Sequence, residues 1–250
     1  MRVFYFNLTK MKRNSLVGLL VAVSFCLIGS IVIKQQIVPS TAGSKPHAIY
    51  KVQTKEKLVA LTFDISWGTK VPGPVMDILK KNNIKSTFFL SGPWAEKYPH
   101  FPKRLVREGH EIASHGDRHI NLSQESPETV RKEIMSAHNK LKKVTGISPS
   151  LIRTPNGDWD DMVLSICDDL GYKVIQWSAD SMDWKKPGVK EIVNGVLEKA
   201  HPGAIILMHA SDTCSQTPDA LPAVIKGLKE KGYQFVTVSE LLKYGPGVID

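Results

Sequence analysis

The sequence predicts an α/β fold in which about seven parallel strands form a β/α barrel, closed or nearly closed, behind an N-terminal transmembrane helix. Three observations lead to this prediction. Apolar strand-like runs alternate with amphipathic helical stretches from about residue 51 to the end of the chain. The chain has 250 residues, 42% of them hydrophobic and 23% charged, and a β/α barrel commonly takes about 200 to 250 residues as one domain. An uncharged run near the N-terminus is long enough to cross a bilayer.

The N-terminal segment indicates membrane insertion. Residues 1–14 carry four basic side chains and no acidic one, and residues 15–33 carry no charge. At a rise of about 1.5 Å per residue, the run of 15–33 approaches the roughly 30 Å thickness of the hydrocarbon layer, which predicts one transmembrane helix. The basic flank places residues 1–14 in the cytoplasm and the chain after the helix outside the membrane. Residues 40–42 resemble a signal-peptide cleavage site but lie well beyond the apolar run, so a retained anchor is favoured over a cleaved signal.

The remainder of the chain is predicted to be a short linker and one domain. Residues 34–50 are rich in Pro, Gly, Ser and Thr, which is typical of a linker, and residues 51–250 form the domain. Without the four basic residues of the N-terminal segment, the formal net charge falls from +9 to +5, which suits an anionic wall polymer or a plain solvated surface equally. The predicted position of the domain outside the membrane argues against a nucleic-acid partner. Cys167 reads as a core residue and Cys214 as a weak nucleophile candidate, so no disulfide framework is expected.

The individual elements follow from hydrophobic period and turn residues. Strands are predicted at 58–63, 86–90, 111–114, 151–153, 173–178, 204–208 and 234–236. Helices are predicted at 72–81, 127–145, 160–170, 190–199 and 219–231. Ser126 is the expected cap of the second of these helices, because Pro127 takes the first helical position and Glu128 follows it.

Polar side chains follow the ends of several predicted strands. In a β/α barrel the carboxyl ends of the strands open on one face, where active sites are built, so these side chains are expected to converge. Taken singly, each has a simpler explanation, since an Asp after a strand is often a helix cap and a lone His is often structural. The residues are Asp64, His115, His119, Arg153, Asp180, Asp183 and His209.

Five segments in this order resemble the motifs of the polysaccharide deacetylase family, the family-4 carbohydrate esterases. The resemblance runs from about residue 59 to residue 242, and the segment 64–68 (DISWG) with the single anchor is most similar to the membrane-anchored, sporulation-associated members. It implies a distorted β/α barrel and metal-assisted removal of acetyl from an N-acetyl amino sugar of peptidoglycan or a related wall polysaccharide. The segments are Thr62-Phe63-Asp64, Ser114-His115-Gly116-Asp117-Arg118-His119, Arg153-Thr154-Pro155-Asn156-Gly157, Asp180-Ser181-Met182-Asp183-Trp184 and Leu207-Met208-His209.

The resemblance implies a role for each residue that carries chemistry. His115 and His119 would hold a divalent metal, zinc or alternatively cobalt. Asp64 would be the general base, held ionised by Arg153. His209 would protonate the leaving amine, with Asp183 setting its tautomer and raising its pKa.

The resemblance also assigns the substrate-binding surface. The backbone N–H of Asn156, which follows Pro155, would help to stabilise an oxyanion. Trp184 and Leu207 would contact the sugar, although Trp184 could equally be a core aromatic. Trp67 is a second candidate for a flat face that meets the sugar, but for Trp67 the interpretation as a core aromatic is favoured.

The first motif departs from the family. Active members usually have two acids there, the second a metal ligand, and this chain has Ile65 in the second place. Gly116 also replaces the usual hydroxyl residue. Three explanations are open: Asp117 or Asp64 completes the metal shell, the metal binds weakly with extra waters, or turnover has been lost and glycan binding retained. An enzyme is favoured over a binding relic because the other charged groups are all present. The wall sugar and the oligomeric state are not indicated by the sequence.

Overall fold

The computed structural model describes residues 45–249. The predicted cytoplasmic segment 1–14, the predicted transmembrane helix 15–33 and most of the predicted linker lie outside these residues. The described part of the chain contains no helix with both the length and the apolar composition that a membrane crossing requires.

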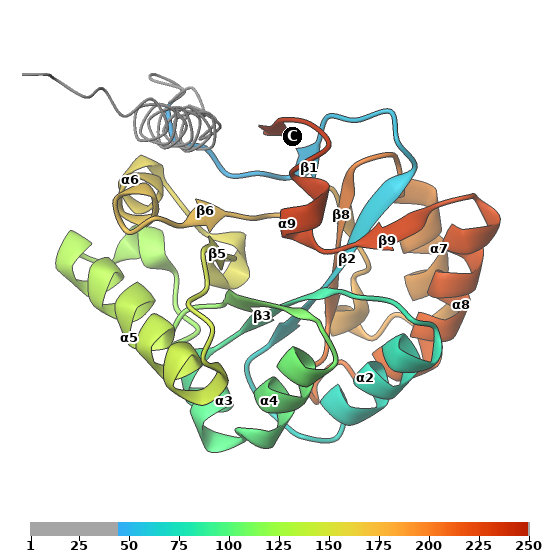
Figure 1. Cartoon of the computed structure of the whole chain (residues 1–250), viewed down its shortest axis with the longest axis horizontal. Helices are drawn as coiled ribbons and strands as arrows, with labels where there is room; N and C mark the ends of the chain where they lie inside the picture. Colours follow the sequence, from blue (N-terminus) through green and yellow to red (C-terminus); the bar gives the residue numbers. More distant parts are fainter. Residues whose placement is uncertain (1–44, 250) are drawn as a thin grey trace, which may run out of the picture. The chain divides into compact units, whose positions relative to one another are not determined.

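A strongly curved, mixed β-sheet forms the centre of the domain (Figure 1). Its order is β10-β1-β8-β2-β3-β4-β5-β6, with β7 added beside β8 and β9 beside β2. The parallel prediction is confirmed for β2 to β9, whose pairings with one another are all parallel, whereas β1 pairs antiparallel with β10 and β8. The strands of the described residues are β1 (Lys51–Val52), β2 (Leu58–Ile65), β3 (Thr87–Leu90), β4 (Glu111–Ser114), β5 (Leu151–Ile152), β6 (Lys173–Val174), β7 (Ala179–Asp180), β8 (Ala204–His209), β9 (Gln234–Val236) and β10 (Gly247–Val248).

The expectation of an all-parallel barrel of about seven strands is therefore corrected to a curled mixed sheet. The two antiparallel additions come from opposite ends of the domain, and each is only two residues long, which is too short to show a period of two in the sequence. The predicted strand 173–178 is also shorter than expected. Beyond Val174 the chain leaves β6, forms a single bridge with Ile49, and reaches β8 through a hydrogen bond from Ser178 N–H to the Ile205 carbonyl.

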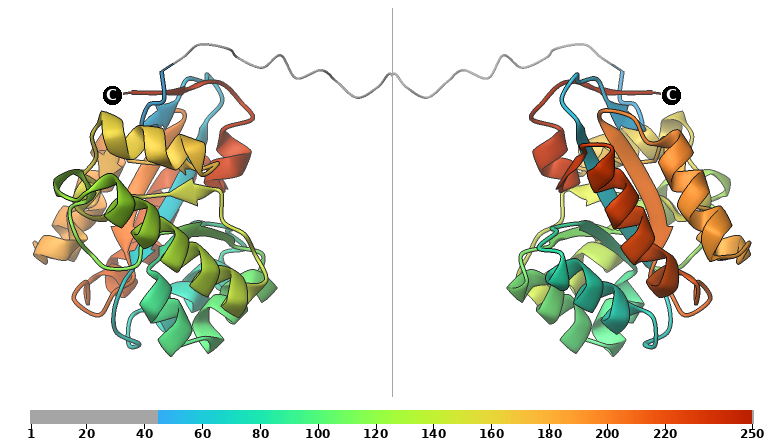
Figure 2. Two further views of the ribbon diagram at one scale, coloured as in Figure 1. Left: turned by 90° about the vertical axis from the view of Figure 1, so that its left-hand side faces the viewer. Right: turned by 90° about the vertical axis from the view of Figure 1, so that its right-hand side faces the viewer.

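Helices cover the outside of the curved sheet, as Figures 1 and 2 show. The five predicted helices of the domain are present, and three short ones, α3, α4 and α9, were not predicted. The Ser126 hydroxyl accepts a hydrogen bond from Thr129 N–H at 3.2 Å, which confirms the predicted cap. Between residues 45 and 249 the helices are α2 (Pro72–Lys81), α3 (Gly92–Lys97), α4 (His100–Arg107), α5 (Pro127–Thr145), α6 (Asp161–Asp169), α7 (Val189–Lys199), α8 (Thr217–Glu230) and α9 (Val238–Leu241), with short 3₁₀ turns η1 (Leu122–Gln124), η2 (Pro155–Gly157) and η3 (Asp183–Lys185).

Strand β2 runs through the centre of the sheet and is buried along its whole length. Side chains alternate between the two faces of a strand, and a parallel strand covered on both faces is apolar on both. Phe63 and Ile65 join the apolar cluster that includes residues of α2, α7 and α8. Thr62 and Asp64 point to the other face, where both contact Arg153.

The domain begins before residue 51. Ala48 and Ile49 fall in the range predicted as a linker, yet both are buried. Ile49 N–H donates to the Val174 carbonyl at 2.9 Å, and Gln176 N–H donates to the Ile49 carbonyl at 2.7 Å. This segment therefore joins the β1 side of the sheet to the β6 side and completes the curl.

Candidate active site

A cavity of about 450 Å³ lies at the carboxyl ends of the central strands. Three of the predicted site residues are buried and do not line this cavity: Arg153, Pro155 and Asp183. The remaining predicted site residues line it, so the segments converge as expected for one face of a barrel. The lining is Asp64, Trp67, His115, His119, Asn156, Gly157, Trp177, Asp180, Trp184, Leu207, His209, Thr213 and Cys214.

Arg153 is fully buried beneath the cavity and binds Asp64. Its Nη1 donates to Asp64 Oδ1 at 2.7 Å and to Thr62 Oγ1 at 2.9 Å. Its Nη2 donates to the Gln176 carbonyl at 3.0 Å, and the guanidinium lies 4.1 Å from the centre of the Phe89 ring. The guanidinium is thus held from several sides, and it leaves Asp64 Oδ2 free to face the cavity.

Asp64 is held ionised. Burial by itself raises its pKa, but the charge of Arg153, the neighbouring His115 and His209, and the hydrogen bond from Arg153 together outweigh burial and hold the pKa below its ordinary value. Burial lowers the pKa of Arg153, and Asp64 opposes that change; an arginine stays charged nonetheless because its pKa starts so high. A carboxylate with one free oxygen at neutral pH is suited to accept a proton or to bind a metal.

The two predicted metal ligands lie next to each other and are neutral. His115 Nδ1 lies 2.8 Å from the Arg153 carbonyl oxygen, so it carries the proton and donates, and Nε2 keeps its lone pair 3.7 Å from Asp64 Oδ2. Burial lowers the pKa of His115 to about 4, and burial also lowers the pKa of His119. The two rings are 5.3 Å apart and steeply inclined. An imidazole whose second nitrogen donates to a carbonyl is a common arrangement of metal-binding histidines, so this pair fits zinc or a similar divalent ion.

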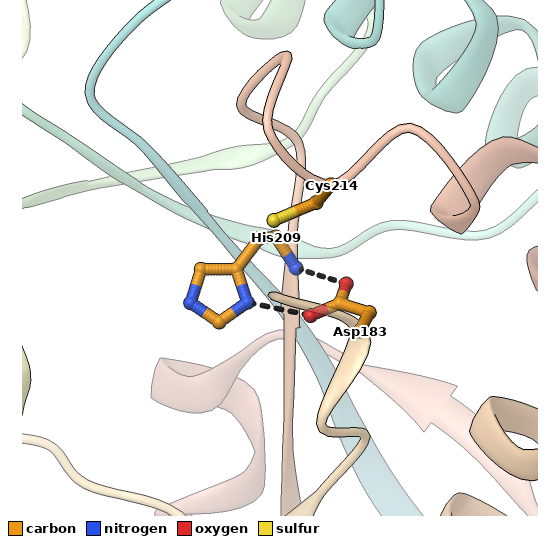
Figure 3. Close-up of side chains that lie close together, drawn as sticks. All are labelled: Asp183, His209 and Cys214. Atoms are coloured by element: carbon orange, nitrogen blue, oxygen red, sulfur yellow. Dashed lines mark hydrogen bonds and ion pairs between the residues drawn. The ribbon is translucent and has the colours of Figure 1, made fainter. Parts of the chain in front are cut away.

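A different group of three potential ligands in the described residues fits a metal less well (Figure 3). One ligand atom each from Asp183, His209 and Cys214 lies within 4.8 Å of the others. Both carboxylate oxygens of Asp183 already accept hydrogen bonds, from His209 and from the Thr217 hydroxyl. Burial raises the pKa of the Cys214 thiol to about 12, whereas a metal requires the thiolate. This group is a hydrogen-bonded support for His209 and not a metal site.

The two carboxylates that could complete the metal shell, Asp117 and Asp64, have different surroundings. Asp117 is excluded, because its two oxygens are bound by Lys140 Nζ at 2.7 and 2.9 Å and by the Ser136 hydroxyl, and it does not line the cavity. Ile65 is fully buried in the apolar cluster on the helix side of β2. Asp64 Oδ2 is therefore the carboxylate oxygen within reach of His115.

His209 ends β8 and is held by Asp183. Asp183 Oδ1 accepts from His209 Nδ1 at 2.7 Å, and Oδ2 accepts from His209 N–H at 2.8 Å (Figure 3). Burial lowers the pKa of His209, but the hydrogen bond and charge of Asp183, aided by Asp64 and Asp180, outweigh burial, so the pKa is raised. Nδ1 is committed to Asp183, and Nε2 is the nitrogen available for proton transfer.

Of the residues predicted to bind substrate, Asn156, Leu207 and Trp184 line the cavity and Pro155 does not. Asn156 adopts a left-handed conformation with φ 59° in η2, and its side chain donates to Asn121 Oδ1 at 2.7 Å. Pro155 is buried beneath it and does not line the cavity. Leu207 lines the cavity with little exposure, and Trp184 is 50% exposed there, so Trp184 is not a core residue.

The favoured core interpretation of Trp67 is wrong. Its side chain is 42% exposed and lines the cavity, because the chain turns outward directly after β2. Trp177 and Thr213 also line the cavity and were not predicted. Trp177 follows the unexpectedly short β6 and Thr213 lies in a polar loop, so neither falls at the end of a recognisable strand.

The chain is similar in sequence to known proteins over most of its length. Residues 51–175 match the family model described as polysaccharide deacetylase. The chain is 36% identical over 201 residues to a peptidoglycan-N-acetylglucosamine deacetylase of Bacillus cereus, covering 79% of this chain and 94% of the relative. It is 34% identical to the peptidoglycan-N-acetylmuramic acid deacetylase PdaA of Bacillus subtilis, covering 79% and 76%. It is 31% identical to the uncharacterized protein YlxY of Bacillus subtilis, and that match spans 83% of this chain but only 65% of YlxY.

Solved structures are similar over the same region. The wild-type BA3943 of Bacillus anthracis, described as a CE4 family pseudoenzyme, superimposes with a TM-score of 0.76 at 34% identity, covering 80% of this chain and 70% of that chain. A BA3943 mutant described as having restored enzymatic activity also has a TM-score of 0.76, at 35% identity, covering 80% and 72%. The motif geometry, the curled sheet and these matches agree, and the chain belongs to the polysaccharide deacetylase family.

Proposed function

We propose that this protein hydrolyses the N-acetyl group of an amino sugar in peptidoglycan or a related cell-wall polysaccharide. The observation that carries the proposal is the set of groups at one cavity: an ionised Asp64 on a buried arginine, two neutral imidazoles, and His209 on Asp183. Amide hydrolysis requires a base, an acid and stabilisation of the oxyanion, and this set can provide each of them.

The side chains divide these tasks by position. A divalent metal held by His115 and His119 would supply a Lewis acid for the acetyl carbonyl and lower the pKa of water. Asp64 Oδ2 accepts the proton of the attacking water, since Oδ1 is committed to Arg153. His209 Nδ1 is bound to Asp183, so His209 Nε2 is the nitrogen that, once protonated, donates to the departing amine, while Asp183 stabilises the positive charge. The Asn156 backbone N–H would donate to the oxyanion.

A second function is glycan binding without turnover. It is favoured by Ile65, which has no lone pair to offer a metal, and by the likeness to BA3943, itself described as a pseudoenzyme. If Asp64 Oδ2 serves the attacking water and not the metal, the metal keeps two imidazoles and water as ligands and is expected to bind more weakly than at a site with three protein ligands.

Acetate release distinguishes the two functions. The full chain is incubated with N-acetylated peptidoglycan fragments and zinc, cobalt or a chelator, and released acetate is measured beside the Asp64→Asn variant. Metal-dependent release that the variant lacks supports the enzyme. Binding of the fragments without release under any metal supports the glycan-binding protein.

The proposal extends to location. We propose that residues 15–33 anchor the protein in the cytoplasmic membrane with the domain outside, where the wall polymer lies, and that it acts during spore formation. Support comes from the basic flank, the uncharged run and the similarity of residues 64–68 to sporulation-associated family members. Digestion of the domain by protease added to intact protoplasts tests the orientation, and its protection there would contradict it.

A further inference from the structure

Trp67 is an exposed aromatic side chain in the cavity to which neither the metal nor the proton transfers assign a task. We infer that Trp67 forms a second sugar-binding surface on the β2 side of His209, so that the protein binds a chain of several sugars rather than a single sugar. The inference rests on the proposed function in one respect, since it takes an N-acetylated glycan as the ligand.

The Trp67 ring is held in place although it is exposed. Its Nε1 donates to the Thr213 hydroxyl at 3.1 Å, and its carbonyl accepts from Asp212 N–H at 3.3 Å. The preceding Ser66 N–H donates to the Ser211 hydroxyl at 3.0 Å. The loop after β2 is thus joined to the loop after β8 at three successive points. A ring whose polar atom is already bonded loses little conformational freedom when a ligand stacks on it.

The rest of the loop is held as tightly. Asp212 Oδ1 accepts from Lys70 N–H at 2.7 Å and from Val71 N–H at 3.1 Å. Gly68 has φ +83°, and a Cβ there would stand 2.1 Å from Asp212 Cγ, so no larger residue fits. Trp94 Nε1 donates to the Gly68 carbonyl at 2.8 Å. This loop presents Trp67 as part of a built surface.

The topology places Trp67 and Trp184 on either side of His209. Strand β2 pairs along the length of β8, and β7 pairs with β8 at Ile206 and Leu207, so β2 and β7 occupy opposite edges of β8. Trp67 follows β2, Trp184 follows β7, and His209 ends β8 between them. Both indoles line the same cavity and are exposed by 42% and 50%.

This arrangement suits an extended glycan. The faces of pyranose rings that carry C–H groups stack on aromatic rings, and each such contact buries apolar area. One side of Trp67 meets the His119 ring edge-on at 5.5 Å, and the exposed remainder is open to ligand. A chain that crosses His209 can rest one sugar on Trp184 and another on Trp67, whereas a short fragment can use only one of them.

Calorimetric titration of the full chain with the dimer and the tetramer of N-acetylglucosamine tests the inference, with a chelator present so that no turnover occurs. Trp67→Ala should weaken tetramer binding about tenfold, the equivalent of about 1.4 kcal/mol, and change dimer binding by less than about threefold. Trp67→Phe keeps a ring and should retain tetramer binding within about threefold. Tyr244→Ala is the matched control, because Tyr244 is 49% exposed but lies outside the cavity, and it should change neither affinity.

The outcomes separate this inference from the proposed catalysis. Tetramer binding that is unchanged in Trp67→Ala, or absent in the wild type, overturns the inference. Loss of tetramer binding in Trp67→Ala with no acetate release by the wild type supports the inference and overturns the catalytic proposal. The indole N–H resonance of Trp67, assigned by its absence from the Trp67→Phe spectrum, should shift on tetramer addition, which shows that the effect is local; an unmoved resonance contradicts the inference.

Discussion

The buried pair of Asp64 and Arg153 makes a quantitative prediction about stability. Replacing Asp64 with Asn keeps the shape of the side chain and removes the charge that Arg153 faces at 2.7 Å. Breaking a fully buried ion pair by neutralising one partner costs about 3–5 kcal/mol. Arg153 keeps acceptors on Thr62 and Gln176, and the Asn oxygen can still accept, so the expected loss is at the lower end, about 3 kcal/mol. For a domain of this size such a loss lowers the melting temperature by roughly 6–12 °C.

Denaturant unfolding followed by circular dichroism measures this loss at neutral pH. The double variant Asp64→Asn/Arg153→Met is the matched control, since it removes the uncompensated cation and should regain much of the stability. The folded pKa of Asp64 lies below the ordinary 3.8, so the contribution of the pair is present above 3.8 and is lost as the pH falls through the folded pKa. The difference between wild type and Asp64→Asn should therefore shrink in acid. A loss under about 1 kcal/mol at neutral pH, the usual value of an exposed pair, or a difference unchanged in acid, would refute this reasoning.

Three further predictions concern the metal and the acid. Ile65→Asp should tighten zinc binding at least about tenfold, measured by competition with a chromophoric chelator, and should destabilise the metal-free protein because Ile65 is fully buried. Equal zinc affinity in Ile65→Asp and Ile65→Asn would contradict the explanation that the site lacks a carboxylate ligand at position 65. Because Asp183 raises the pKa of His209, activity should fall as the pH rises through that pKa, and Asp183→Asn should move this fall in kcat/KM to lower pH; an unmoved profile argues against His209 as the acid. Asp117→Asn should leave zinc affinity within about twofold, since Lys140 already holds that carboxylate, and a large drop would return Asp117 to the ligand set.

Much of the sheet could be predicted because its strands are long or bounded by turns. The predicted strands 111–114 and 234–236 and the predicted helices 72–81 and 127–145 coincide with the observed elements. Strands β1, β7 and β10 have two residues each, and helices α3, α4 and α9 are short, so no period emerges in the sequence. The short strands exist because neighbours in space supply their hydrogen bonds.

Some residues of the candidate site could be predicted from the sequence and others could not. Asp64, His115 and His209 could be located because each stands at the end of a strand, and the motifs assign their order. Trp67 could not be placed, since its exposure depends on a loop held by residues about 145 positions away in the chain, as the Ser66 to Ser211 contact shows.

The sequence by itself determined the α/β alternation, the membrane signal as a prediction, and the identity of the groups that carry chemistry, because hydrophobic period and residue type are local properties. Only the tertiary structure decided that the sheet is curled and mixed, that Asp117 is bound to Lys140 and so is not a ligand, and that Trp67 faces the cavity. The physical reason is that a side chain's partners are set by which distant segments pack beside it. The sequence does not distinguish a carboxylate that binds a lysine from one that binds an arginine or a metal.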